Sequence, residues 1–201
     1  MALTYPLAMP FSRFVRTQFE IVPVVARNRI GSGATFAREI APAFWRADLT
    51  SAPHREDEFG RWLAFFDALR GGAKSFLLFD PHRCFPIAHS GFTGTGTIAS
   101  ISSPRQISVS GLPGAFKLTA GDYIGFERSG RYSLHRVVAD ASASGGGAAS
   151  VSIEPALAPH FTAGSLVRLN RPVGEFMLDS YSAERRSGKK PVSFTATSRV
   201  F

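Results

Sequence analysis

The feature that most constrains the fold of this chain is a series of short runs in which polar and apolar residues alternate. Turn-forming phrases separate these runs. Between residues 91 and 172 the turn phrases are LPGAF, TAGD, RSGR, SASGGG and PHFTAG. The runs between them, such as RQISVSGL and AASVSIEP, alternate with the period of two that turns one face of a strand toward a core. Many short strands at this spacing predict an antiparallel barrel or sandwich.

The residues on either side of this unit predict a second β domain. The first 50 residues are rich in β-branched and aromatic residues between turn signals, which indicates a hairpin followed by a loop. Pro23 and Pro42 lack the N–H that a sheet ladder needs, so we expect them at edges or bulges. GEFMLDSYSAE and PVSFTATSRVF again resemble paired strands. We therefore expect residues 1–90 and 173–201 to form an antiparallel β-sandwich, with residues 91–172 inserted as a small β-barrel-like domain.

One segment, residues 55–70, has the periodicity of an amphipathic helix. Its first turn is acidic, which suits the positive end of the helix dipole, and Gly71 and Gly72 follow its end. We interpret it as a packing helix and not as a ligand site. Five large apolar residues fall on one helical face: Phe59, Trp62, Leu63, Phe66 and Leu69.

Charge and cysteine content narrow the function classes. A formal charge of +8 over 201 residues raises the question of an anionic partner. Most basic residues are single arginines, and the one dense cluster is Arg185, Arg186, Lys189 and Lys190. We interpret that cluster as a solvated loop or a contact with a partner or DNA. The single cysteine excludes an intramolecular disulfide, and no segment has the apolar length of a membrane span, so we expect no membrane insertion.

Local motifs for catalysis or cofactor binding are weak. GTGTIA at residues 94–99 matches the dinucleotide fingerprint formally, but an alternating strand follows it in place of a helix. His82 and His89 flank Cys84, which leaves a thiol nucleophile or a zinc site as a minor hypothesis, since both need further partners. We therefore expect no enzyme activity, no catalytic residues, no cofactor and no metal.

The barrel-like unit also suggests a binding module for nucleic acid or a host-surface glycan. Small barrels bind such ligands on grooves where exposed aromatic rings stack on bases or sugars. The candidates for this role are Tyr123, Phe126, Tyr132 and His135. Because these residues alternate with polar ones, core packing explains at least some of them.

The stretch FWRADLTSAPHREDEFGRWLAFFDALRGGAKSFLLFDP resembles the N-terminal region of siphophage minor tail and distal tail proteins. It has a strand, an amphipathic helix, a Gly-Gly turn and a Phe-rich strand that ends in Asp-Pro. The turn phrases of residues 94–179 are also similar to those of tail proteins in phages and prophages. Together these segments cover about residues 44–179.

This resemblance implies a structural subunit of a tail tip or baseplate. Such a subunit forms a homo-oligomeric ring, a hexamer in this family, that joins the tail tube protein to hub and baseplate proteins, and carries its second β domain outside the ring. It implies synthesis in the cytoplasm of a bacterial host and a final location in the virion. DNA passage through the ring lumen and contact with a negative partner both remain open as uses of the positive charge.

Overall fold

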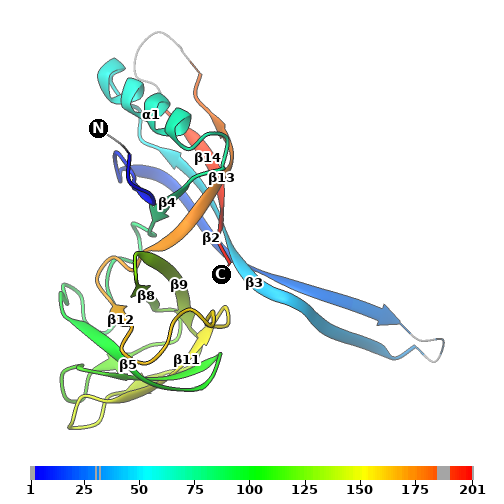
Figure 1. The fold of residues 1–201 in the computed structure, drawn as a ribbon, viewed down its shortest axis with the longest axis vertical. Helices are drawn as coiled ribbons and strands as arrows, with labels where there is room; N and C mark the ends of the chain where they lie inside the picture. Colours follow the sequence, from blue (N-terminus) through cyan, green and yellow to red (C-terminus); the bar gives the residue numbers. More distant parts are fainter. Residues whose placement is uncertain (1–2, 30, 32, 185–190, 201) are drawn as a thin grey trace.

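The computed structural model describes residues 3–29, 31, 33–184 and 191–200. Strands hold 50% of the chain and one helix holds 7%, which confirms the mainly β fold class, with antiparallel sheets and a small barrel. The first unit is a six-stranded sheet in the order β1-β4-β13-β14-β3-β2 (Figure 1). Its strands are β1 (Leu7–Ala8), β4 (Ser75–Leu78), β13 (Gly174–Ser182), β14 (Ser193–Ser198), β3 (Thr35–Ser51) and β2 (Phe14–Arg29).

The second unit is a closed barrel in the order β11-β6-β5-β12-β8-β9. All of its strand pairs are antiparallel, and all of its strands lie between β4 and β13 in the sequence. Strands β7 (Lys117–Leu118) and β10 (Ala141–Ser142) form a separate two-stranded ribbon. In the sequence, β7 lies between β6 and β8, and β10 lies between β9 and β11. The barrel strands are β5 (Thr95–Ser103), β6 (Gln106–Ser110), β8 (Tyr123–Arg128), β9 (Arg131–Val137), β11 (Ala149–Glu154) and β12 (Leu166–Arg168).

The helix α1 (Glu56–Ala68) is shorter than the span of residues 55–70 that the sequence predicts. At its start Arg55 is the N-cap, and its backbone N–H donates to Oε2 of Glu58 at 3.2 Å. At its end Leu69 is the C-cap, and Arg70 already has a positive φ of 52°. The predicted first residue, Arg55, is therefore the N-cap, and the predicted last residue, Arg70, lies just past the C-cap. Arg70 cannot continue the right-handed helix because its backbone is in the left-handed region.

The helix covers one face of the six-stranded sheet and supplies much of its core (Figure 1). Four of the five apolar residues named from the sequence are buried, and Leu63 is half-buried against the same core. Phe65 is also buried, although it lies outside the predicted stripe. It fits because its ring packs edge-on against Phe76 of β4 at 5.5 Å.

Two hydrophobic cores result, one for the sheet with its helix and one inside the barrel. The sheet core does not stop at the sheet, because it includes Tyr123 and Leu134 from the β8–β9 hairpin of the barrel. Where the chain leaves the sheet for the barrel and where it returns, the two connections touch: the backbone N–H of Arg171 donates to the carbonyl of Cys84 at 2.7 Å. The barrel is thus joined to the sheet by packing and by paired connections.

Candidate functional site

The β2–β3 hairpin continues far beyond the sheet and projects from the body of the molecule (Figure 1). We call residues 24–29 and 35–41 of this hairpin the arm. Within the sheet β3 pairs with both β14 and β2, but in the arm it pairs with β2 alone. Two strands without a covering layer are marginally stable in water. The arm is therefore the part of the described structure that most clearly lacks a partner.

The base of the arm contains both prolines. The register of β2 against β3 shifts between Val22 and Val24 and again between Val24 and Val25, beside Pro23 and Pro42. Strand β2 is the edge strand of the sheet, so both prolines lie where a missing N–H or a bulge is tolerated. This confirms the prediction that they occupy edges or bulges.

The register of the hairpin gives the arm an apolar face. Ala26 lies opposite Arg38 and Asn28 lies opposite Phe36, so these four share a face. Ile40, two residues beyond Arg38, is the extra residue at the register shift opposite Val24 and Val25. The side chains of Phe36 and Ile40 are 60% and 64% exposed. Full burial of such a side chain contributes roughly 1.5–3 kcal/mol, which the isolated molecule does not gain.

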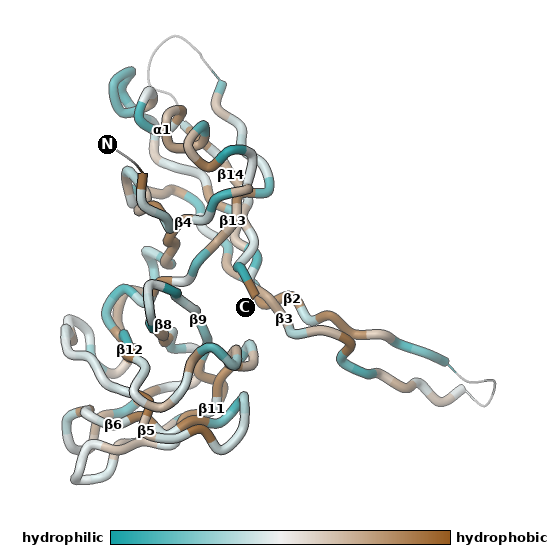
Figure 2. The backbone as a smooth tube through the Cα atoms, in the orientation of Figure 1, coloured by the Kyte–Doolittle hydropathy of each residue, from teal (hydrophilic) through white to brown (hydrophobic). Residues whose placement is uncertain are grey.

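The opposite face of the arm is basic and approaches the barrel. Arg27 and Arg29 share this face with Glu39. The carboxylate of Glu39 accepts hydrogen bonds from Nη2 of Arg105, which lies in the β5–β6 turn, at 2.6 Å. Nε of Arg105 also lies 2.6 Å from Oε1 of Glu154 on the barrel. The barrel thus contacts this face of the arm at Glu39, and Phe36 lies on the other face. Both hydrophobic and hydrophilic residues line the arm (Figure 2).

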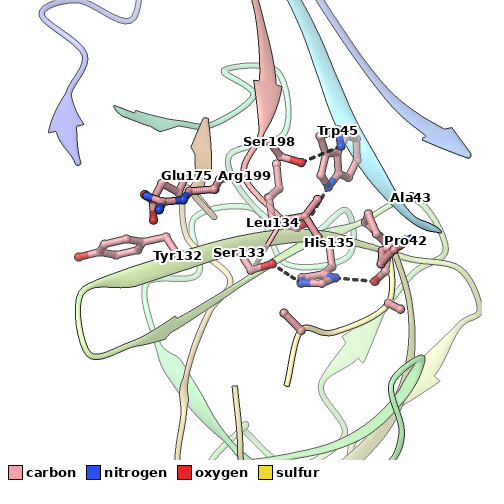
Figure 3. A pocket seen from close by; sticks show the side chains of 15 residues that line it. Pro42, Ala43, Trp45, Tyr132, Ser133, Leu134, His135, Glu175, Ser198 and Arg199 are labelled. Carbon is pink, nitrogen blue, oxygen red and sulfur yellow. Dashed lines mark hydrogen bonds and ion pairs between the residues drawn. The ribbon is translucent and has the colours of Figure 1, made fainter. Parts of the chain in front are cut away.

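A small cavity of about 30 Å³ lies where the arm base, the sheet and the barrel meet (Figure 3). Nε1 of Trp45 donates to the carbonyl of Leu134 at 2.6 Å, which fixes β3 to β9. The guanidinium of Arg136 lies 4.9 Å from the Trp45 ring centroid and 5.4 Å from that of Tyr123. Ligand pockets usually begin near 300 Å³, so this cavity is a structural junction.

His135 is buried in this junction. Its Nδ1 lies 2.7 Å from the carbonyl oxygen of Pro155, and its Nε2 lies 2.6 Å from the hydroxyl of Ser133 (Figure 3). Burial lowers its pKa from 6.5 to about 4, and the hydrogen bond to Pro155 opposes that shift. The imidazole is therefore neutral at physiological pH and belongs to the packing of the junction.

Glu175 is the buried carboxylate of the same junction and is 3% exposed. Its Oε1 accepts from the hydroxyl of Ser75 at 2.6 Å and from Nη1 of Arg199 at 3.1 Å. These contacts tie β13 to β4 and to the residue that follows β14. A buried charge with two partners of this kind is a structural feature of the sheet.

The barrel residues proposed from the sequence as stacking platforms do not form an exposed surface. Phe126 and His135 are 1% exposed and Tyr123 is 7% exposed. Of the four candidates only Tyr132 is half-exposed, and its hydroxyl lies 3.4 Å from Oε1 of Glu127. Core packing therefore explains three of the four candidates, because the alternation turns their rings into the cores.

The Cys84 neighbourhood lacks the arrangement of a thiol nucleophile. Sγ of Cys84 donates to the carbonyl of Pro81 at 3.2 Å, and burial raises the pKa of this thiol. Nε2 of His89 accepts from the backbone N–H of Lys117, and its ring stacks on Phe116. Neither His82 nor His89 hydrogen-bonds the thiol among the residues that the structure describes. In the same described part, no group of three or more His, Cys, Asp or Glu can hold a metal ion.

Three other features considered in the sequence remain. The basic cluster of Arg185, Arg186, Lys189 and Lys190 lies outside the described residues. Gly96 of the GTGTIA phrase lies in β5, where an added Cβ would meet the carbonyl oxygen of Ser110. The glycine therefore permits close approach of two strands. No described helix is long and apolar enough to cross a membrane.

Sequence reasoning missed the arm as a surface. The signal was present, because residues 24–29 and 35–41 combine strand residues with several arginines and a turn, but their exposure depends on which strands stand beside them. No protein-family model matches this chain, and no curated protein matches it at a significant level.

Proposed function

We propose that this protein is a structural subunit of the tail tip of a phage-like particle, in which copies assemble into a ring between tail tube and hub. The observation that carries the proposal is the arm, where no described part of the chain covers Phe36 and Ile40. A projecting ribbon of this kind suits a subunit that is completed by its neighbours.

The resemblance of residues 44–179 to distal tail proteins supplies the biological setting. The division of labour in the fold is compatible with it: the sheet with α1 and the arm would form the ring, and the barrel would lie at the periphery. Ring subunits that join head to tail use two different surfaces, and this chain offers different surfaces at the two edges of its sheet.

Electron microscopy of the purified protein, together with binding assays against the tail tube and hub proteins from the same genome, tests the proposal. We expect closed rings, or rings that form when the tube protein is added. A strictly monomeric protein at high concentration, with no affinity for tube or hub proteins, would contradict the proposed function.

The alternative of a nucleic-acid or glycan module has one specific observation in its favour, the exposed Arg27 and Arg29 on the basic face of the arm in a chain of charge +8. The aromatic residues Tyr123, Phe126 and His135 of the barrel do not support this alternative, because they are buried. Titration with labelled oligonucleotides at several salt concentrations, and with a glycan array, tests it. Binding that weakens steeply with salt would support a nucleic-acid partner.

A further inference from the structure

A second apolar surface lies at the far edge of the same sheet. A groove of about 290 Å³ opens beside β1 and β4 and is lined by Met9, Phe11, Leu77, Phe79 and Val173. All five side chains are half-buried. We call this surface the β1–β4 groove. Its size exceeds that of apolar cavities of about 150 Å³ that hold a benzene ring, so it has room for a phenylalanine side chain.

The arm and the groove lie at opposite edges of the sheet. Beta-1 is the first strand of the sheet and β2 is the last. The arm continues away from the body, on the side opposite β1 and β4 (Figure 1). It therefore cannot fold back into the groove of its own chain. Two different surfaces at opposite edges are the arrangement that a head-to-tail contact between copies requires.

The chemistry of the groove matches that of the apolar face of the arm. The guanidinium of Arg171 lies 6.0 Å from the ring centroid of Phe79, at the side of the groove. A second aromatic ring placed there would meet both an aromatic edge and a cation, two contacts that favour an aromatic residue. Phe36 is the exposed aromatic residue of the arm.

Acidic residues of α1 are connected to the groove through His54. The ring of Phe11 in the groove lies 5.3 Å from that of His54, and Nδ1 of His54 lies 3.3 Å from Oε2 of Glu58. His54 therefore connects the groove to the acidic first turn of α1, which also carries the exposed Asp57. On the arm, Arg38 shares a face with the apolar residues. Arg38 is thus a cation beside the apolar residues of the arm, and the first turn of α1 supplies carboxylates on the side of the groove.

We propose that the apolar face of the arm docks in the β1–β4 groove of a second copy of this chain, with Arg38 against the acidic first turn of α1. This inference rests on the proposed function, because it names the contact through which the ring would form. Each copy gives its arm to one neighbour and receives an arm from the other. Repetition of such a contact closes a ring or extends a filament.

The first experiment measures self-association of the full chain by sedimentation velocity over a range of concentrations. We expect the wild type to form oligomers. The double variant Phe36→Ser/Ile40→Ser should weaken this association at least about tenfold, because it removes the apolar strip. The matched control is Val15→Ser, since Val15 is also 64% exposed on β2 but lies outside the arm. Association that is equally strong in wild type and double variant overturns the inference.

The second experiment tests the head-to-tail pairing with a mixture. Met9→Glu places a charge in the groove and should also weaken association of the full chain. When this groove variant is mixed with the Phe36→Ser/Ile40→Ser variant, one intact arm and one intact groove remain. We expect the mixture to form dimers and nothing larger. A mixture that remains monomeric, while each variant keeps the wild-type circular dichroism, overturns the inference.

A charge exchange keeps the inference testable if the groove variant does not fold. Arg38→Glu and Asp57→Arg each reverse one charge at an exposed position, so both should leave the fold intact. Each alone should weaken association, and the two changes in one chain should restore much of it. Restoration supports the contact between Arg38 and the first turn of α1. If association stays weak in the chain that carries both Arg38→Glu and Asp57→Arg, the contact between Arg38 and the first turn of α1 is contradicted.

The outcomes separate this inference from the proposed function. If the wild type is monomeric alone but binds the tail tube protein through Phe36 and Ile40, the arm has a different occupant: the inference fails and the tail function stands. If the arm binds an oligonucleotide and Arg38→Glu abolishes that binding, the inference also fails. Rings that form normally without the apolar strip overturn the inference while leaving ring assembly intact.

Discussion

Arg105 in the barrel holds Glu39 in the arm, with Nη2 of the guanidinium 2.6 Å from both carboxylate oxygens. This pair joins two parts of the chain that share no hydrophobic core at that point. Both side chains are more than one-third exposed, at 44% and 40%. Exposed ion pairs contribute at most about 1 kcal/mol to stability, so the pair orients the arm and stabilises the fold only slightly.

We therefore predict that Arg105→Ala changes the mobility of the arm more than the stability of the protein. Hydrogen–deuterium exchange in residues 24–29 and 35–41 should become faster, while the midpoint of chemical unfolding stays close to the wild-type value. Arg83→Ala, which removes an exposed arginine from the loop after β4, is the control. Unchanged exchange in the arm would show that the ion pair does not restrain it.

Trp45 provides a prediction about the junction of sheet and barrel. Trp45→Phe keeps an aromatic ring but removes the N–H that donates to the carbonyl of Leu134. A buried carbonyl without its partner costs about 1–3 kcal/mol, so the free energy of unfolding should fall by that amount. Urea titration followed by circular dichroism measures this. Phe19→Leu, at the edge of the same core, is a control that removes no hydrogen bond.

His135 makes the protein sensitive to acid. Because its folded-state pKa of about 4 lies below the ordinary 6.5, the unfolded chain binds more protons between these two values. The contribution of this group is therefore fully present above pH 6.5 and is lost as pH falls toward 4. The two pKa values correspond to roughly 3 kcal/mol at most.

The measurement is the free energy of unfolding at several pH values for wild type and His135→Gln. The variant keeps a neutral polar side chain and should lack this part of the pH dependence. His82→Gln, at an exposed position, should follow the wild type. Parallel curves for wild type and His135→Gln would contradict the assignment.

Two glycines around α1 should respond in opposite directions to alanine. Gly72 has a φ of +89°, and a Cβ there would overlap the carbonyl oxygen of Leu178, so Gly72→Ala should destabilise the protein by more than about 1 kcal/mol. Gly60 lies inside the helix with open space around it, and Gly60→Ala should stabilise by up to about 1 kcal/mol. Thermal unfolding of both variants measures these effects. Equal shifts of the midpoint temperature in the two variants would contradict the structural explanation.

The sequence was informative wherever a local pattern decides the structure. Alternation and turn phrases predicted the β-rich class, and the spacing of Phe59, Trp62 and Phe66 predicted the helix. Asp122 lies between Gly121 and Tyr123, and its carboxylate accepts from the backbone N–H groups of Thr119 and Ile87. These features depend on residues close together in the chain.

The sequence could not predict which face of a strand would be covered. Phe126 and Phe36 both stand in alternating runs, yet one is 1% exposed and the other 60%. The difference arises from distant elements: the barrel closes around Phe126, while no described layer covers Phe36. For the same reason the contacts of Glu175 with Ser75 and Arg199 could not be predicted, since they join three separate segments.

The hydrogen bond between Arg171 and Cys84 has a consequence for how such a protein can change over time. It brings together the two connections through which the chain leaves the sheet and returns to it. A segment whose ends lie side by side can be exchanged for another of different length without moving the strands that it joins. The barrel therefore has the connectivity of a segment that can be replaced as a unit, and recombination at these two connections would exchange it for another domain while β4 and β13 remain in register.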